Sequence, residues 1–159
     1  MKKETYYLQI IRQNYRKLSI PRESLNLKLA LPDDAAIAKK LYLNIGELWN
    51  WNSRKKWSNL TWSDYLNNSK NLFYISYLDG IPIGFFEFVT ESDDNSMELR
   101  YFGLDSNYIG LGLGKELLIN VINLAFLMNI DRLWLKTSST DHPNALNNYL
   151  SCGFLNFHP

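Results

Sequence analysis

The sequence contains almost no cysteine and no marked excess of charge, and both features restrict its function. Cys152 is the one cysteine among 159 residues, which excludes an internal disulfide and a cysteine-based metal cluster. A single thiol suits a reducing compartment, so we expect a cytoplasmic protein. The net charge of +1 gives no electrostatic basis for nucleic-acid binding. We therefore expect neither a metal ion nor a nucleic-acid partner.

Long apolar runs are missing too. No window approaches the ~18 consecutive apolar residues of a membrane span, so we expect no membrane partner. Segment 1–15 begins with two lysines, but Gln9 and Arg12 interrupt its short apolar run. It is therefore not expected to be a signal peptide. The sequence has no repeat and no long linker, and its length suits one domain, which we expect to span residues 1–159.

Hydrophobic patterning predicts a mixed sheet with helices on both faces, an α/β fold that some schemes class as α+β. The expected strands are 5–11, 25–31, 71–80, 81–90, 96–104, 132–137 and 154–157. Asp79-Gly80 predicts a tight hairpin between the third and fourth of these strands. The expected helices run from Pro32 to Gly46, from an N-cap at Thr61, over 112–128 and over 142–153.

Three alternating glycines occur in Tyr108–Leu117 (YIGLGLGKEL), just before the third predicted helix. Backbone N–H groups at a helix N-terminus bind anions, and glycines let the backbone approach closely. A nucleotide P-loop is excluded, because Gly114-Lys115 is followed by Glu116 and not by a hydroxyl residue. A dinucleotide fingerprint is a poor match, because the spacing is GxGxG and the following strand ends in Lys136-Thr137. The structural alternative is a glycine-rich turn that only starts the helix.

The same stretch resembles the pyrophosphate loop of the GCN5-related N-acetyltransferases, the GNAT superfamily. The family pattern is Arg/Gln-x-x-Gly-x-Gly/Ala, which residues 109–114 fit except at the Arg/Gln position, where Ile109 stands. The segment LWLKTSSTDHPNALNNYLSCGF resembles the family's last conserved block, with matches at Ala145, Tyr149, Gly153 and Phe154. YFGL and DHPNAL further resemble a little-described bacterial branch. The resemblance covers about residues 25–159.

This resemblance implies a mostly antiparallel sheet in which the fourth and fifth strands of the fold, here 97–104 and 132–137, splay apart to hold acetyl-CoA. Coenzyme A would place its pyrophosphate on the glycine loop and its pantetheine arm along the first of these strands. The residues implied in coenzyme binding are Phe102, Gly103, Leu104, Ile109, Gly110, Leu111, Gly112, Leu113, Gly114, Lys115, His142 and Asn144. His142 replaces the family's asparagine, and either His142 or Asn144 is expected to contact the arm.

The implied reaction is direct attack of a neutral amine on the thioester, which needs a base for the amine and an acid for the departing thiolate. Tyr149 matches the family's tyrosine acid, and a phenol with pKa ~10 can share a proton with a thiol. Glu98 is the expected base, acting through water, with Glu87 and His142 as alternatives. The structural alternatives are a core tyrosine, solvated strand carboxylates and a polar residue at a helix start.

Clustered aromatic residues predict the acceptor site. Four of the five tryptophans lie between Trp49 and Trp62, in the segment that covers the acceptor side of the implied fold. Trp49, Trp51 and Glu87 are therefore expected to bind the substrate, although tryptophans that only anchor an irregular segment fit the sequence equally well. The basic residues 54–56 are expected to be solvated.

The expected function is transfer of an acetyl group from acetyl-CoA to an amine of a small molecule or a peptide. The alternative is a catalytically silent acyl-CoA-binding module that acts as a sensor or interaction partner. The sequence ends soon after its last predicted strand, which leaves an open sheet edge. A second copy of the chain could cover this edge, so a homodimer is expected.

Overall fold

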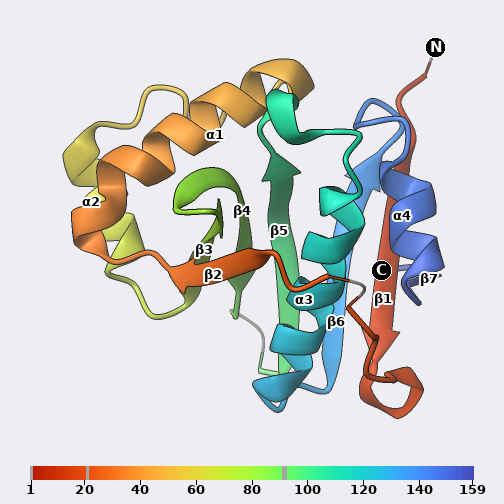
Figure 1. The fold of residues 1–159 in the computed structure, drawn as a ribbon. Coiled ribbons are helices and arrows are strands. Elements are labelled where there is room, and N and C mark those ends of the chain that lie inside the picture. Colours follow the sequence, from red (N-terminus) through yellow and green to blue (C-terminus); the bar gives the residue numbers. More distant parts are fainter. Residues whose placement is uncertain (1, 21, 91–92) are drawn as a thin grey trace.

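The computed structural model describes residues 2–20, 22–90 and 93–159. These residues form seven strands and four α-helices in the predicted order (Figure 1). The elements are β1 (Thr5–Ile11), β2 (Leu25–Leu29), α1 (Ala35–Trp49), α2 (Asn59–Leu66), β3 (Asn71–Leu78), β4 (Ile81–Val89), β5 (Ser96–Leu104), α3 (Leu113–Leu127), β6 (Arg132–Ser138), α4 (Ala145–Ser151) and β7 (Leu155–Asn156). Among the described residues, none of the helices has the length and apolarity that a membrane crossing requires.

The strands form one sheet in the order β2-β3-β4-β5-β6-β1-β7. Neighbouring strands are antiparallel except β5 and β6, which are parallel. The mixed, mostly antiparallel sheet is thus confirmed. The N-terminal strand β1 pairs with β6 from Thr5 opposite Ser138 to Ile11 opposite Arg132. The sheet ends in the two-residue strand β7, which pairs with Leu8 and Gln9 of β1. The homodimer stays a prediction.

The parallel strands β5 and β6 separate soon after they begin. Their register runs from Ser96 opposite Arg132 to Glu98 opposite Trp134 and stops there, although both strands continue. On the other side of β5, Glu87 and Phe88 of β4 pair with Tyr101 and Leu99, so Arg100 is an extra residue in the ladder. Such a bulge bends its strand. The two strands consequently diverge toward the top of Figure 1, as the sequence predicted.

Helices cover both faces of the sheet. Successive residues of a strand point to opposite faces, and Phe85 and Phe86 of β4 belong to different hydrophobic clusters. Phe86 packs in a cluster with residues of α3, whereas Phe85 packs in a cluster with residues of α1 and α2. In Figure 1, α3 lies in front of β5 and β6, and α1 and α2 lie beside β2, β3 and β4. The predicted layers are therefore confirmed.

Helix α1 does not stop at Gly46 as predicted. It continues to Trp49 and ends at Asn50, whose φ of 58° is left-handed. A Cβ on Gly46 would lie 2.8 Å from the Cβ of Trp51, so the glycine gives room for Trp51 to fold back onto the helix. Gly46 therefore allows the close contact with Trp51, and it does not end the helix.

Helices α2 and α4 also differ from the prediction, because they begin at other residues. Helix α2 begins earlier than predicted, because the Ser58 hydroxyl caps it by accepting a hydrogen bond from the N–H of Thr61 at 3.1 Å. Helix α4 begins at Ala145, three residues later than predicted, with Asn144 at the N-cap position. The hairpin at Asp79-Gly80 is confirmed, since both residues have positive φ.

The connection between α1 and α2 is anchored by a buried ion pair. Arg54 was expected to be solvated, but it is only 5 % exposed, and its partner Glu87 of β4 is 0 % exposed. Two N–H···O bonds of 2.7 Å join them, and the Tyr65 hydroxyl donates to Glu87 at 2.6 Å. The guanidinium lies 4.3 to 5.8 Å from the rings of Tyr42, Trp57, Trp62, Tyr65 and Tyr101. Lys55 and Lys56 are exposed, as predicted.

Replacing Arg54 with methionine should destabilise the protein, because it leaves the Glu87 carboxylate buried without its cation. Breaking one side of a buried pair costs about 3–5 kcal/mol. We expect the Arg54→Met variant to lose that much free energy of unfolding in urea, and the Arg54→Met/Glu87→Leu double variant to lose much less than the sum of the two single changes.

Lys55→Met is the matched control, because the exposed neighbour should change the free energy of unfolding by no more than about 0.5 kcal/mol. A loss below about 1 kcal/mol for Arg54→Met, or additive losses in the double variant, would show that the ion pair does not anchor the segment.

Candidate active site

A cavity of about 910 Å³ lies where β5 and β6 diverge. Residues from five parts of the chain line it: the start of β1, the second half of β5, the glycine loop before α3, the end of β6 with the following turn, and α4. Trp49 and Trp51 close it from the end of α1. The cavity is therefore a consequence of the splayed strands.

The glycine loop lines one side of this cavity. Gly110, Gly112 and Gly114 all lie on its wall, together with Ile109 and Lys115. Gly110 and Gly112 have φ of 85° and 78°, a conformation that side chains rarely adopt. Gly112 is the N-cap of α3, so the first N–H groups of a 15-residue helix are available at this wall. The site offers backbone donors and a helix dipole to an anion.

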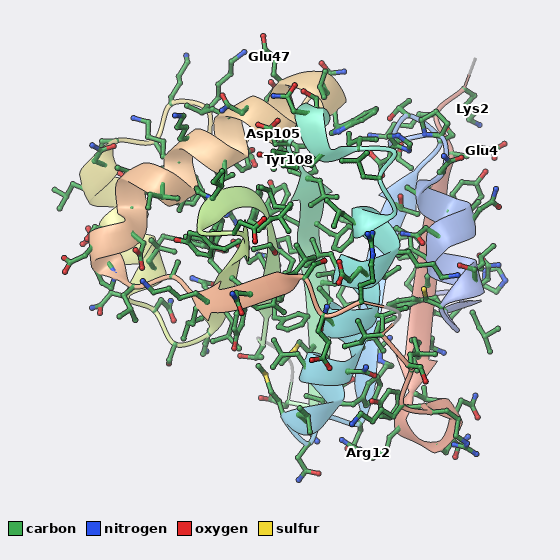
Figure 2. All side chains as sticks on the ribbon, viewed as in Figure 1. Lys2, Glu4, Arg12, Glu47, Asp105 and Tyr108 are labelled. Carbon is green, nitrogen blue, oxygen red and sulfur yellow. The ribbon has the colours of Figure 1, made fainter. Side chains whose placement is uncertain are left out.

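Two predicted loop residues lie outside the cavity lining. Leu111 is 58 % exposed at the surface, and Leu113 is buried in the core cluster beside α3. Only their backbone can face a ligand on the loop. Figure 2 shows Asp105 and Tyr108 near the upper end of β5, where the chain turns from the strand into this loop.

A cation that the sequence did not reveal lies next to the loop. The Arg22 guanidinium donates a hydrogen bond to the carbonyl of Leu111 at 3.2 Å. The same nitrogen is 3.8 Å from the position of a Cβ on Gly112. Ser24 holds this segment on α3, because its N–H and hydroxyl both donate to the Glu116 carboxylate. The fold thus brings an arginine to a loop that has Ile109 at the family's Arg/Gln position.

Tyr149 lies on the opposite wall, on α4. Its ring contacts those of Phe102 and Phe154, with centroids 6.2 and 5.7 Å away. Burial raises the pKa of the Tyr149 phenol, and the charge of Asp141 raises it further. The hydroxyl forms no hydrogen bond with the described part of the chain. Tyr149 is therefore a neutral phenol at the cavity wall. Its hydroxyl proton is not used in a hydrogen bond with the described residues.

His142 and Asn144 also line the cavity, between β6 and α4. The Nδ1 atom of His142 accepts a hydrogen bond from the N–H of Asn144 at 3.1 Å. Its ring meets Trp49 edge to face at 5.5 Å. The Nδ1 atom of His142 thus stabilises the chain just before α4. This is the structural role that the sequence left open as the alternative to a catalytic base.

Neither predicted carboxylate reaches the cavity lining. Glu98 sits at the last paired position of β5 and β6, and its carboxylate accepts a hydrogen bond from Arg100 at 2.9 Å. Arg100 itself does line the cavity. Glu87 was expected at the acceptor site, but it lies buried on β4, where Arg54 and Tyr65 occupy both of its oxygens. The placement of Glu87 is therefore corrected.

Aromatic residues form the wall nearest α1. Trp49, Trp51 and Tyr101 line the cavity, and the Tyr101 hydroxyl lies 2.9 Å from that of Ser53. A Cβ on Gly103 would lie 2.7 Å from the Cγ2 of Ile45, so the glycine lets α1 approach β5. The other two tryptophans of the cluster surround Arg54 instead. The cluster therefore contains both a cavity wall and a structural anchor.

Comparison with curated proteins finds a partial likeness. The chain is 32 % identical over 75 residues to N-acetylaspartate synthetase of Danio rerio and 31 % identical over 75 residues to that of Xenopus tropicalis. The matches cover 47 % of this chain but only 27 % and 28 % of those proteins. The chain thus matches about a quarter of the length of these relatives.

Solved structures share the fold. A GCN5-related N-acetyltransferase from Sphaerobacter thermophilus superposes with a TM-score of 0.74 at 13 % identity, over 98 % of this chain and 49 % of that chain. Spermidine N-acetyltransferase from Vibrio cholerae, solved with CoA and spermine, gives 0.72 at 16 % identity, over 86 % and 84 %. The IAA acetyltransferase from Bacillus cereus gives 0.64 at 23 % identity, over 85 % and 79 %.

The family comparison extends over most of the chain. Residues 37–154 match the Acetyltransferase (GNAT) family model. This range contains the glycine loop, both splayed strands and Tyr149, whereas the cavity residues of β1 lie outside it. The chain belongs to the GNAT family of acetyltransferases.

Proposed function

We propose that the protein is an N-acetyltransferase that moves an acetyl group from acetyl-CoA to an amine of a small molecule or a peptide. One observation carries the proposal. A single cavity joins an anion-binding glycine loop at the N-terminus of α3 to a neutral phenol, Tyr149, across the gap between β5 and β6. The similar proteins include an N-acetylaspartate synthetase and a spermidine N-acetyltransferase, which supports an amine acceptor.

The residues present fit coenzyme A. Its pyrophosphate would take the N–H groups around Gly110 and Gly112, with the cations of Lys115 and Arg22 beside it. Its pantetheine amides would pair with the edge of β5 over 102–104, because β6 no longer pairs with β5 beyond Glu98. Coenzyme A would thus complete the sheet where the protein leaves it incomplete.

Side chains of the protein would carry out the two proton transfers of the reaction. The amine nitrogen forms a bond to the acetyl carbon as the carbon–sulfur bond breaks, so the nitrogen loses a proton and the thiolate gains one. Tyr149 would give its proton to the sulfur. Glu98 remains our candidate base, acting through a water, because it stands at the last paired position of β5 and β6 and its partner Arg100 reaches the cavity.

The alternative, a silent acyl-CoA-binding module, has one observation in its favour. Among the described lining residues Asp141 is the only carboxylate, and it already accepts hydrogen bonds from the Thr137 hydroxyl and the Ser138 N–H. Binding and turnover therefore need separate tests. We also propose that the protein works in the cytoplasm, since its single cysteine is a free thiol.

Replacing Gly112 with alanine should weaken acetyl-CoA binding. The side chain would distort a positive-φ position from which backbone N–H groups meet the pyrophosphate, and one lost charge-assisted hydrogen bond of about 1.5–3 kcal/mol corresponds to at least about a tenfold rise in Kd. Titration calorimetry with acetyl-CoA measures this change.

Gly80→Ala is the matched control, because Gly80 has nearly the same φ (79° against 78°) but lies in the β3–β4 hairpin. Both variants should lose about 1–2 kcal/mol of stability from the left-handed backbone. Equal affinity of the two variants for acetyl-CoA would mean that the glycines only turn the chain.

Replacing Tyr149 with phenylalanine should lower kcat by about 10²–10⁴-fold with little change in the KM for acetyl-CoA. The fold should tolerate the change, because the hydroxyl has no hydrogen-bond partner among the described residues. Burial raises the pKa of Tyr149 above its usual ~10, so the phenol stays protonated and the wild-type kcat should show no loss from its ionisation between about pH 7 and 9.

The measurement is thiol release from acetyl-CoA in the presence of amines, with Tyr108→Phe as a control at a half-buried tyrosine outside the cavity lining. An unchanged kcat in Tyr149→Phe would remove this residue from the reaction. Acetyl-CoA binding without turnover for any amine would favour the silent module.

A further inference from the structure

The N-terminal strand forms part of the cavity, on the side away from the glycine loop. Thr5 and Tyr7 of β1 lie opposite Ser138 and Lys136 of β6, and all four residues line the cavity. Leu135, the neighbour of Lys136, packs in the core cluster beside α3. Because side chains alternate along a strand, Lys136 points to the other face of the sheet. We call this part of the cavity, lined by residues 3, 5, 7, 136 and 138, the β1–β6 lobe.

The β1–β6 lobe contains two cations that form no ion pair with the described residues. Lys3 and Lys136 both line it, and both are exposed. The nearby carboxylates accept hydrogen bonds from other groups. Asp141 accepts from Thr137 and Ser138, and Glu4 accepts from the Tyr6 hydroxyl at 2.6 Å. Arg100 adds a third cation on the opposite wall, although Glu98 partly neutralises it.

We propose that the β1–β6 lobe binds a carboxylate of the acceptor, so that the acceptor is a small amine that also carries a carboxylate, such as an amino acid. This inference rests on the proposed acetyl transfer. Two ammonium groups and the neighbouring hydroxyls of Thr5, Tyr7 and Ser138 are donors that suit a carboxylate. A polycationic amine would meet like charges here and be disfavoured.

The position of the lobe separates it from the coenzyme phosphates. The phosphate-binding loop and α3 lie at one wall, whereas Lys3 and Lys136 come from β1 and β6. Residues 2–11 also fall outside the range 37–154 that matches the family. The carboxylate subsite therefore combines residues of β1 that lie outside this range with Lys136 and Ser138 that lie inside it.

A positive lobe also suits the chemistry of the amine. Nearby cations disfavour the protonated form of an ammonium group and lower its pKa. An acceptor held by its carboxylate would lose the ammonium proton more readily, which the direct attack requires. The lobe would thus serve both to recognise the acceptor and to favour its reactive form.

The first test compares amines with and without a carboxylate, with kcat/KM calculated for the neutral amine. Rates of thiol release from acetyl-CoA would be measured with aspartate and asparaginamide, with glycine and glycinamide, and with spermidine. We expect kcat/KM to be at least about tenfold higher for each carboxylate than for its amide, and lowest for spermidine. Equal or higher rates with the amides or with spermidine would overturn the inference while leaving the proposed acetyl transfer intact.

The second test uses lysine variants. Lys136→Ala and Lys3→Ala should each raise the KM for aspartate about tenfold and leave the KM for acetyl-CoA and the rate with asparaginamide unchanged. Lys136→Arg should restore much of the loss. Lys2→Ala is the matched control, because Lys2 (labelled in Figure 2) neighbours Lys3 in the sequence but is not a lining residue of the cavity. A rise in the KM for acetyl-CoA instead would assign the lysines to the coenzyme phosphates and overturn the inference.

A binding measurement separates this inference from the proposed enzyme activity. Aspartate and asparaginamide, which carries no carboxylate, would be titrated into the CoA-saturated protein and into its Lys136→Ala variant. Preferential binding of aspartate that Lys136→Ala abolishes would support the carboxylate subsite even if no amine is acetylated, in which case the proposed enzyme activity fails. Equal binding of both probes, or of neither, would overturn the subsite.

Discussion

The end of pairing between β5 and β6 is the constraint on which the site depends. Parallel strands normally remain hydrogen-bonded along their length, but here the ladder stops at Glu98 and Trp134. The extra residue Arg100 bends β5 on its other edge. Backbone groups beyond this point lose their partner strand, and a cavity opens there. The cavity receives the N-terminus of α3 and Tyr149 of α4. If β5 and β6 stayed paired, no cavity would lie between the N–H groups at the start of α3 and the Tyr149 phenol.

The buried pair of Arg54 and Glu87 supports this gap from one side. It fixes the connection between α1 and α2 on β4, and the same connection carries Trp51 and Ser53 to the cavity wall and to Tyr101. On the other side, β1 holds β6 by a full antiparallel ladder and brings its own polar residues to the cavity. The gap therefore lies between an aromatic wall and a basic wall, each fixed by these contacts. Such an arrangement suits a preorganised binding site.

Much of this arrangement could be predicted from the sequence, because its signals are local. The order of strands and helices follows from periodicity, and the glycine loop and Tyr149 follow from short motifs with fixed spacing. Contacts between distant segments could not be predicted. Arg54 looked like one of three solvated charges, and only the fold brings it to a carboxylate 33 residues away. Gly46 looked like a helix end, because nothing local shows that Trp51 would pack against it. The place of β1 beside β6, and of Arg22 beside the glycine loop, depends on pairings across most of the chain.

The most direct test of this account is the thermal stability of the protein with acetyl-CoA, CoA, ATP and NAD. A ligand at a hundred times its Kd should add about 2.7 kcal/mol. For a domain of this size, that raises the midpoint of unfolding by roughly 5–10 °C. The account predicts this shift with acetyl-CoA and CoA and none with ATP or NAD. No shift with either CoA species, or an equal shift with all four ligands, would contradict the claim that the gap between β5 and β6 is an acyl-CoA site.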